Sequence, residues 1–216
     1  MERVKIVVQD VVETSWARIK DLAKDGAKDG LLKSGNLIPV TLKNGEEIQL
    51  VVAHDEFDRV FFVLKDCNTE HKMATPTNAY ECVWATSDMR RYLNEEVFPL
   101  LQDDLQAVIK PTKIVQIFND KHFETEDKLF LLSQTQVFGK GYWSNFEPED
   151  TQLDCFTDKK SRMKLMYREK CSLLGNCPWW LRAPNYWGVF RFVTHDGCGQ
   201  SNDANCEFGV IFAFTL

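Results

Sequence analysis

The chain has 216 residues and a mass of 25.0 kDa, which is enough for one sizeable hydrophobic core. Its net charge of -6 and isoelectric point near 5.3, with no basic stripe along the sequence, argue against a nucleic-acid-binding protein. No apolar stretch reaches the length of a membrane span, and seven irregularly spaced cysteines argue against a complete disulfide framework.

Short-range patterns predict three elements in the first quarter of the chain. A strand is expected at Val4–Val8, and apolar residues at helical spacing predict a helix over Ser15–Ala23. Alternating apolar residues in 38–42 and 48–52 flank Asn44-Gly45. This arrangement is typical of a β-hairpin in which both turn residues take a positive φ.

Further elements are expected in the middle of the chain. Val60–Leu64 predicts a more fully buried strand, and Ser87 is expected to cap a second helix. Another strand is predicted at Lys128–Leu132, followed by a capping box in Ser133–Gln136 that opens a short helix. The apolar face of the second helix and of the segment after it comprises Met89, Leu93, Val97, Leu100 or Leu101, Leu105, Val108 and Ile109.

Residues 139–178 are polar and follow no clear period, which predicts a long irregular insertion. Within it, Lys159–Arg162 is interpreted as a short charged loop, and Glu147, Glu149 and Asp150 as a solvated acidic loop. No internal repeat or linker interrupts the sequence. We therefore expect one domain, with a scaffold in 1–138, the insertion in 139–178 and a functional C-terminal region in 179–216.

The C-terminal region differs from the rest of the chain in composition. It begins with Trp179–Pro184 and ends with Gly209–Leu216, and both segments have the composition of packed framework. The last segment is apolar on both alternating sets, which predicts a central strand. Between the two lie small, polar and aromatic residues with almost no Lys or Glu, a mixture that fits a binding loop and an ordinary surface loop equally well. The aromatic residues set among its small and polar ones include Tyr186, Trp187, Phe192 and Phe208.

The reactive side chains do not predict a metal or catalytic site. The cysteine spacings are wider than those of structural zinc sites, and the C-terminal loops have no carboxylate-rich cluster suited to calcium. His195 and Asp196 lie close to Cys198, but we favour three polar residues on one surface loop over a cysteine nucleophile. We expect no catalytic residue, no metal and no cofactor. The residues considered for metal binding are Cys171, Cys177, His195, Cys198 and Cys206.

Three motifs occur in order along the chain. Residues 84–94 have the form Trp-x-x-Ser-x-x-Arg-x-x-Leu-Asn, and residues 127–133 have the form Asp-Lys-x-Phe-Leu-Leu-Ser. The third comprises Trp180-Leu181-Arg182-Ala183-Pro184, then Phe190, Val193, Gly197 and Ala204, and finally Gly209-Val210 and Phe212-Ala213-Phe214. With these motifs the chain resembles the variable proteins of diversity-generating retroelements, which occur in phages, prophages and bacteria. One departure is 210–213, where many of those proteins have Val-Arg-Pro-Ala.

The resemblance implies an α+β, C-type lectin-like fold related to that of formylglycine-generating enzymes. Such a fold has mixed, mainly antiparallel sheets, two main helices and long irregular loops. In these systems a reverse transcriptase copies template adenines unfaithfully, usually at Asn-type codons, and the C-terminal strands and loops display the resulting binding face. Such codons cannot produce Trp, Gln or Glu, so Trp187, Gln200 and Glu207 are expected to be invariant.

The resemblance also divides the C-terminal region into two sets of residues. The expected framework comprises Trp180, Arg182, Phe190, Val193, Gly197 and Gly209. The expected variable, ligand-binding positions, called the candidate residues below, are Tyr186, Gly188, Thr194, His195, Asp196, Cys198, Ser201, Asn202, Asp203, Asn205, Cys206 and Phe208. Strand alternation places Phe192 on the same face as Phe190, so Phe192 belongs to the core unless a bulge turns it outward.

The leading hypothesis is a non-enzymatic, diversified ligand-binding protein that recognises a protein or cell-surface target. The alternatives are an enzyme on the related scaffold, with Cys198 or Cys206 as a reactive thiol, and an undiversified phage structural protein. We expect no nucleic-acid partner and no membrane insertion. Synthesis is expected in the cytoplasm without a signal peptide, and the resemblance implies display on a phage particle or a cell surface.

Overall fold

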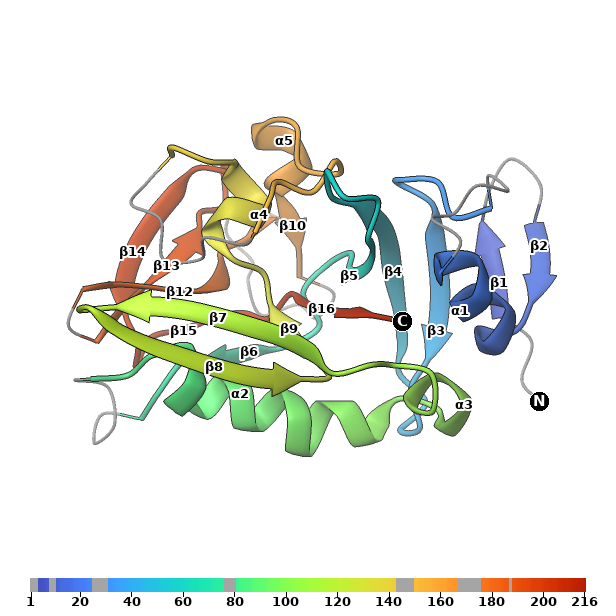
Figure 1. Ribbon diagram of the computed structural model, residues 1–216, viewed down its shortest axis with the longest axis horizontal. Coiled ribbons are helices and arrows are strands. Elements are labelled where there is room, and N and C mark those ends of the chain that lie inside the picture. Colours follow the sequence, from blue (N-terminus) through green and yellow to red (C-terminus); the bar gives the residue numbers. More distant parts are fainter. Residues whose placement is uncertain are drawn as a thin grey trace.

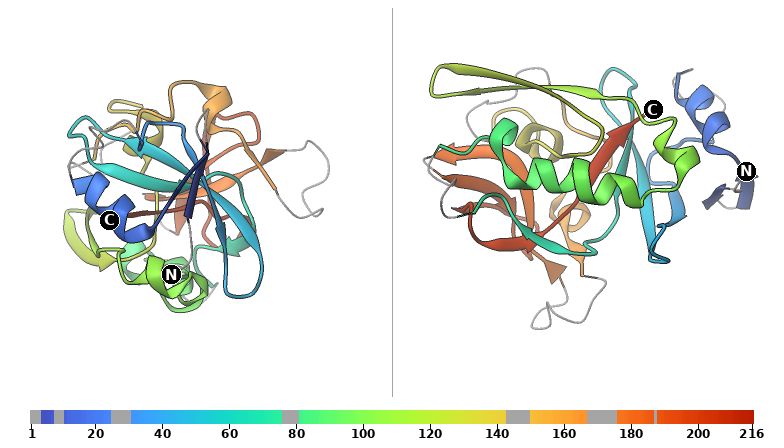
Figure 2. Two further views of the ribbon diagram at one scale, coloured as in Figure 1. Left: turned by 90° about the vertical axis from the view of Figure 1, so that its right-hand side faces the viewer. Right: turned by 90° about the horizontal axis from the view of Figure 1, so that it is seen from below.

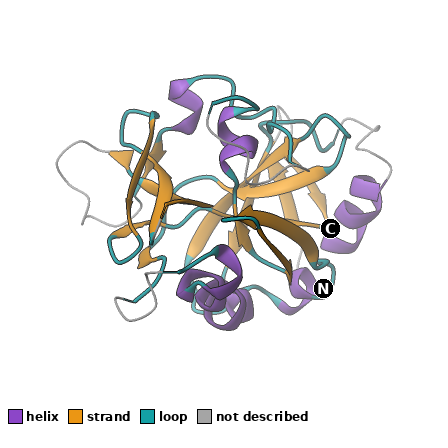
Figure 3. Cartoon of the chain, turned by 60° about the vertical axis from the view of Figure 1, so that its left-hand side comes forward, coloured by secondary structure: helices purple, strands orange, loops and turns teal. Residues whose placement is uncertain are grey.

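The chain folds into two larger sheets with helices around their outside (Figure 1; Figure 3). The structure is a computed structural model that describes residues 4–7, 11–24, 31–75, 81–142, 150–166, 176–186 and 188–216. The α+β class expected from the sequence is confirmed. In the described part of the chain, no helix has both the length and the apolar character needed to cross a membrane.

The larger sheet has seven strands in the order β2-β1-β3-β4-β5-β16-β9, and its pairings are antiparallel. Its strands are β1 (Val4–Val7), β2 (Val11–Thr14), β3 (Leu37–Thr41), β4 (Glu47–His54), β5 (Val60–Leu64), β9 (Phe130–Leu131) and β16 (Phe212–Thr215). β16 lies between β5 and β9. The prediction that the C-terminal strand is central and covered on both faces is confirmed, because Phe212, Ala213 and Phe214 are all buried.

The second sheet has five strands in the order β14-β13-β12-β15-β6 and contains most of the C-terminal region. Its strands are β6 (Glu70–Lys72), β12 (Trp179–Tyr186), β13 (Val189–Val193), β14 (Gly199–Asp203) and β15 (Glu207–Gly209). Only the β12–β15 pair is parallel among these described pairings. The sequence predicted β12 and β13 but not β14, whose polar residues show no apolar period of two, or β15, which has only three residues.

The β3–β4 hairpin forms where the sequence predicts it, with Thr41 opposite Glu47. Gly45 has a φ of 84°, whereas Asn44 does not take a positive φ. The Leu42 N–H donates to the Glu46 carbonyl at 2.7 Å, so the loop is longer than two residues. The expectation that both turn residues take a positive φ is therefore wrong, because the longer loop needs only its glycine in the left-handed region.

Two helical segments match the predicted helices. α1 (Trp16–Lys24) buries Trp16, Ile19 and Leu22. The second segment follows η1 (Trp84–Thr86) and runs through α2 (Asp88–Tyr92), the π-helical turn η2 (Leu93–Val97) and the 3-10 turn η3 (Phe98–Leu100), and α3 (Asp103–Gln106) comes next. Ser87 caps α2 as expected, because its Oγ accepts a hydrogen bond from the Arg90 N–H at 3.0 Å. Seen from below, this segment runs along the underside of the sheets (Figure 2, right).

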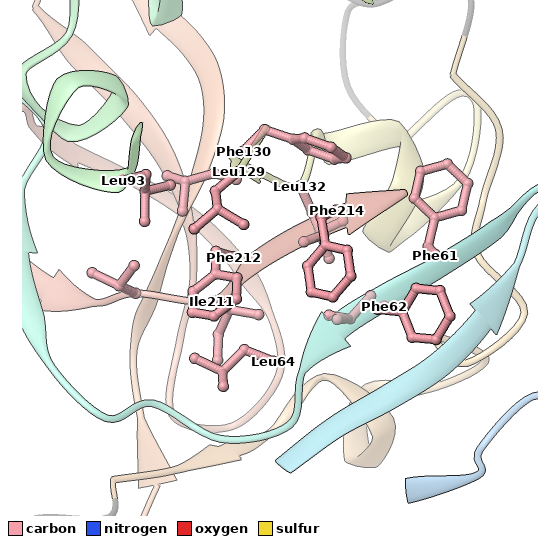
Figure 4. Close-up of a cluster of buried hydrophobic side chains, with 14 of the residues drawn as sticks. Phe61, Phe62, Leu64, Leu93, Leu129, Phe130, Leu132, Ile211, Phe212 and Phe214 are labelled. Carbon is pink, nitrogen blue, oxygen red and sulfur yellow. The ribbon is translucent and has the colours of Figure 1, made fainter. Parts of the chain in front are cut away.

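The core lies between the helices and the larger sheet. Phe62 and Phe214 stack with their ring centroids 5.3 Å apart, and Trp16 meets both edge-on. Leu93 lies in the same cluster, with side chains from β5, β9 and β16 and from the segments next to β9 and β16 (Figure 4). The C-terminal strand is therefore held by side chains from the whole length of the chain.

Short elements fill the remaining described parts. The capping box at Ser133 forms as predicted and opens α4 (Gln134–Phe138). A hairpin that the sequence analysis missed comprises β7 (Thr112–Phe118) and β8 (Lys121–Asp127), and its two turn residues Asn119 and Asp120 both take a positive φ. Asn and Asp tolerate this conformation better than most residues, so this pair was a readable turn signal.

The described part of residues 139–178 contains regular structure as well as loop. It includes α5 (Lys159–Arg162), β10 (Lys164–Leu165) and β11 (Asn176–Cys177). The interpretation of Lys159–Arg162 as a loop is wrong, because the Asp158 carboxylate caps this turn by accepting the Ser161 N–H at 2.8 Å. Glu147 and Glu149 lie outside the described residues.

Candidate functional site

The first two sequence motifs meet at the carboxylate of Asp127, whose side chain is 1 % exposed. Its Oδ2 accepts hydrogen bonds from Trp84 Nε1 at 2.8 Å and from Thr125 Oγ1 at 2.7 Å. Its Oδ1 accepts a hydrogen bond from Arg90 Nε at 2.6 Å. Buried polar groups need partners of this kind, so the cluster fixes η1, α2 and β8 relative to one another.

Asn94 joins the same two motifs through its side-chain amide. Its Nδ2 donates to the carbonyls of Leu129 at 2.9 Å and Arg90 at 3.0 Å, and its Oδ1 accepts the N–H groups of Lys128 and Leu129. The Arg90 carbonyl is the one that the Asn94 main-chain N–H would bind in an α-helix. Its use by the side chain provides a physical reason for the π-helical turn at this point.

The third motif joins the scaffold through Arg182, which is 2 % exposed. Its guanidinium donates to the Leu131 carbonyl at 2.7 Å and to Gln136 Oε1 at 2.9 Å, and it forms an ion pair with Asp150. The prediction that Asp150 lies in a solvated acidic loop is therefore wrong. Its carboxylate balances a buried positive charge that would otherwise be costly in free energy.

Two framework glycines are required for steric reasons. Gly197 has a φ of 77°, and a Cβ there would lie 2.0 Å from the Lys159 carbonyl oxygen. A Cβ on Gly209 would lie 2.4 Å from Cys67 Sγ and 2.7 Å from Cys177 Sγ. Neither position admits a side chain without movement of its neighbours.

The framework and the candidate residues differ in burial. All six framework residues are buried, and Trp180, Phe190 and Val193 are fully buried. None of the candidate residues, all of which the structure describes, is buried. The exposed ones are Tyr186, His195, Asp196, Asp203 and Asn205, and the half-buried ones are Gly188, Thr194, Cys198, Ser201, Asn202, Cys206 and Phe208.

All candidate residues except Phe208 lie on β14 or in the turns at its two ends. Tyr186 and Gly188 are at the β12–β13 turn, next to the β14–β15 turn, because the Ala204 N–H donates to the Gly188 carbonyl at 2.8 Å. The β13–β14 turn, with His195, forms the other end. β14 has five residues, which corresponds to about 14 Å at ~3.4 Å per residue. These candidate residues therefore form a strip along a sheet edge, with a group at each end. Phe208 lies apart from the strip on β15, because β13 and β12 separate β15 from β14.

Side-chain hydrogen bonds order the β13–β14 turn. Thr194 Oγ1 donates to the Asp196 carboxylate and accepts the Cys198 N–H at 3.1 Å. The hydrogen bond from Thr194 is the main reason that the pKa of Asp196 falls to about 2. Lys159 of α5 lies beside this turn, and its contact with Cys198 and the nearby Asp196 charge raise the pKa of the Lys159 amine.

Side chains from α4, from the turn after it and from α5 extend this end of the strip, and the sequence analysis did not find them. Tyr142 is 47 % exposed and stacks on Phe138, with the ring centroids 4.5 Å apart. The Arg162 guanidinium lies 4.7 Å from the Phe138 ring centroid, and its Nε donates to the Gly197 carbonyl at 2.9 Å. Only the capping pair Asp158-x-x-Ser161 marked α5 in the sequence, and no local signal linked it to residue 197.

Phe192 is neither fully buried in the core nor turned outward by a bulge, which are the two alternatives that the sequence left open. It is half-buried, and its ring centroid lies 4.4 Å from that of Phe208 and 6.0 Å from that of Trp180. The β12–β13 pairing has register shifts between Trp180 and Pro184 and between Pro184 and Tyr186, whereas the β13–β14 pairing is continuous. Phe192 thus packs on the core and also contacts the candidate residue Phe208.

The described residues contain no group of three or more His, Cys, Asp or Glu placed to hold a metal ion. Cys171 and Trp187 lie outside the described residues. Cys198 and Cys206 lie at opposite ends of β14, and Cys198 contacts Thr194, Asp196 and Lys159.

Comparison with protein families identifies one match. The model of the family described as "Domain of unknown function (DUF6273)" covers residues 58–216, about three quarters of the chain, including all framework and candidate residues. Comparisons with curated proteins and with solved structures give no match. Because the family model covers well over half of the sequence, the chain belongs to the DUF6273 family.

Proposed function

We propose that this protein binds a macromolecular ligand through β14 and the turns at its two ends. In this proposal the candidate residues are diversified by a retroelement and displayed on a C-type lectin-like scaffold. The ligand is a protein or a cell-surface target, and binding requires no catalysis.

The observation that carries the proposal is the division in burial between framework and candidate residues. A diversified protein must accept many side chains without unfolding, and exposed or half-buried positions usually tolerate substitution within about 0.5 kcal/mol. Buried positions do not, since each large-to-small change there costs several kcal/mol. The resemblance and the burial pattern are independent of each other, and both separate the six framework residues from the candidate residues. Gln200 and Glu207, which the codons would keep invariant, are exposed and lie outside this division.

The hydrogen-bond networks around Asp127 and Arg182 support the proposal for a second reason. The Arg182 network holds β12 against β9 and α4, and the Asp127 network holds η1 and α2 against β8, in both cases through residues outside the candidate set. The backbone that displays the candidate residues is therefore fixed independently of their identity. A rigid backbone that presents adaptable polar and aromatic side chains is the arrangement that recognition surfaces use.

The shape of the strip favours a macromolecule over a small molecule. Small ligands are bound in concave, mostly apolar pockets, whereas the candidate residues other than Phe208 follow a sheet edge about 14 Å long. Tyr186 is 64 % exposed at one end and offers the large, rigid contact area typical of protein-binding surfaces.

A stability experiment tests the surface role. We expect the triple variant Tyr186→Ala, His195→Ala, Asp203→Ala to keep its melting temperature within about 2 °C of the parent chain. The control variant Phe190→Ala should lose about 3–5 kcal/mol of unfolding free energy, because Phe190 is fully buried. A large loss of stability in the triple variant would contradict the proposal.

The DNA next to the gene tests diversification directly. We expect a nearby reverse transcriptase gene and a near-copy of the segment that encodes residues 186–208, with differences concentrated at adenines of the copy. If sequencing finds neither, the diversified function is wrong and an undiversified structural role becomes the better explanation.

A further inference from the structure

The hydrogen-bond register of β14 determines which of its backbone groups point away from the sheet. β13 and β14 pair in continuous register from Val189–Asp203 to Val193–Gly199. Just beyond the two ends of this register, the Thr194 N–H donates to the Cys198 carbonyl and the Ala204 N–H donates to the Gly188 carbonyl. In an antiparallel pair, hydrogen-bonded and non-hydrogen-bonded residue pairs alternate.

Counting inward from either end gives the same result. Gln200 and Asn202 direct their N–H and C=O groups toward β13, whereas Gly199, Ser201 and Asp203 direct theirs to the open edge. Asp203 uses both of its outward groups locally: its N–H donates to Asn202 Oδ1 at 2.9 Å and its carbonyl accepts the Cys206 N–H at 3.0 Å.

Gly199 and Ser201 are different, because no hydrogen bond within the described residues uses their outward N–H and C=O groups. Exposed strand edges of this kind pair readily with another chain. Natural proteins usually protect them with proline, lysine or a bulge, and β14 has none of these.

We propose that β14 binds its ligand by strand addition and that the ligand is an extended, basic peptide segment of a partner protein. This inference rests on the proposed function and names the partner's chemistry. The backbone groups of Gly199 and Ser201 would supply hydrogen bonds that do not depend on side-chain identity. The candidate side chains would then select the sequence, which is how strand addition divides affinity and specificity.

Charge favours a basic segment over a second copy of this chain. Each copy carries a net charge of -6, and Asp203 is exposed at the end of β14. A two-fold arrangement centred on Ser201 would also place Gly199 opposite Asp203, whose backbone groups are already in use. A separate peptide can use all four outward groups of Gly199 and Ser201 without that conflict.

Amide hydrogen exchange measured by NMR tests the register. The probe is a short synthetic peptide of alternating valine and threonine with a lysine at each end. We expect the peptide to slow exchange of the Gly199 and Ser201 amides at least about tenfold. The Gln200 and Asn202 amides, which already bond to β13, serve as internal controls and should change little.

Two substitutions at one residue separate backbone pairing from side-chain contact. Ser201→Pro removes the outward N–H but no β13 bond, and proline is accepted on edge strands in this orientation. Ser201→Ala is the matched control, because both variants lose the same hydrogen bond from Arg191 to Ser201 Oγ. We expect peptide affinity to fall at least about tenfold in Ser201→Pro relative to Ser201→Ala.

Three results would overturn strand addition. They are equal affinity of the two Ser201 variants, unchanged Gly199 and Ser201 exchange at saturating peptide, and protection of both amides in a peptide-free dimer. If Ser201→Pro fails to fold, an N-methylated form of the peptide that binds as well as the parent peptide would also overturn it. None of these results alters the tolerance of the candidate residues or the DNA near the gene, so failure here is distinguishable from failure of the proposed function.

Discussion

Removal of the Asp127 carboxylate is the sharpest test of how the scaffold is held. Asp127→Ala leaves the indole N–H of Trp84 without its partner in the core and leaves the Arg90 guanidinium without its ion pair. Breaking a buried ion pair by removing one partner costs about 3–5 kcal/mol. The Arg90 side chain is 33 % exposed and regains some hydration, so we expect a loss of about 3 kcal/mol.

Urea unfolding followed by circular dichroism measures this loss, and a thermal scan should show a melting temperature lower by about 10 °C. Asp127→Asn is the matched control. It keeps an acceptor for Trp84 but not the charge opposite Arg90, so it should lose about half as much stability. A double-mutant cycle of Asp127→Ala with Arg90→Met should give a coupling energy of about 1–2 kcal/mol. A loss below about 1 kcal/mol for Asp127→Ala, or additive single variants, would refute the argument that this network holds the motifs together.

Further substitutions test other parts of the structure. Gly209→Ala should lose about 3 kcal/mol in urea unfolding, because its Cβ would overlap two sulfur atoms, and unchanged stability would contradict the close packing. The Asp196 carboxyl should titrate by NMR with a pKa of about 2, and Thr194→Val should raise that pKa. Because this pKa lies below its ordinary value, any stabilisation of the turn by the Asp196 carboxylate is present at neutral pH and is lost as the pH falls toward 2. A titration midpoint near 4 for the Asp196 carboxyl would contradict this prediction. Burial raises the pKa of the Cys82 thiol to about 12, so iodoacetamide at pH 8 should alkylate half-buried Cys198 well before Cys82. Peptide mass spectrometry measures the order of alkylation, and alkylation of Cys82 first would contradict this prediction.

Local signals predicted the elements that local interactions determine. The β3–β4 hairpin follows from Asn44-Gly45 between alternating runs, and the N-cap Ser87 and the capping box at Ser133 marked the starts of α2 and α4. The central position of the last strand followed from its two apolar faces. Each of these patterns involves residues a few positions apart, so the sequence carries them directly.

Contacts between distant residues were not readable in the same way. Asp150 was interpreted as solvated because its sequence neighbours are polar, yet it pairs with Arg182, 32 residues later. The edge strand β14 was missed because its five residues are small and polar and pack little on either face. Strand identity there comes from pairing with β13, which no single-segment pattern encodes.

Three candidate residues have structural roles as well as exposure, and this combination bears on how a diversified surface stays folded. Gly188 has a φ of 73°, while Thr194 and Asp196 form the hydrogen bonds of the β13–β14 turn. Asn and Asp are the side chains that best replace glycine in the left-handed region, and short polar side chains readily bond to nearby backbone. A template rich in Asn-type codons would therefore begin from residues suited to such turns. If diversification removed one of these hydrogen bonds, water could replace it because the turn is accessible to solvent, whereas the side chains of Asp127 and Arg182 are almost fully buried.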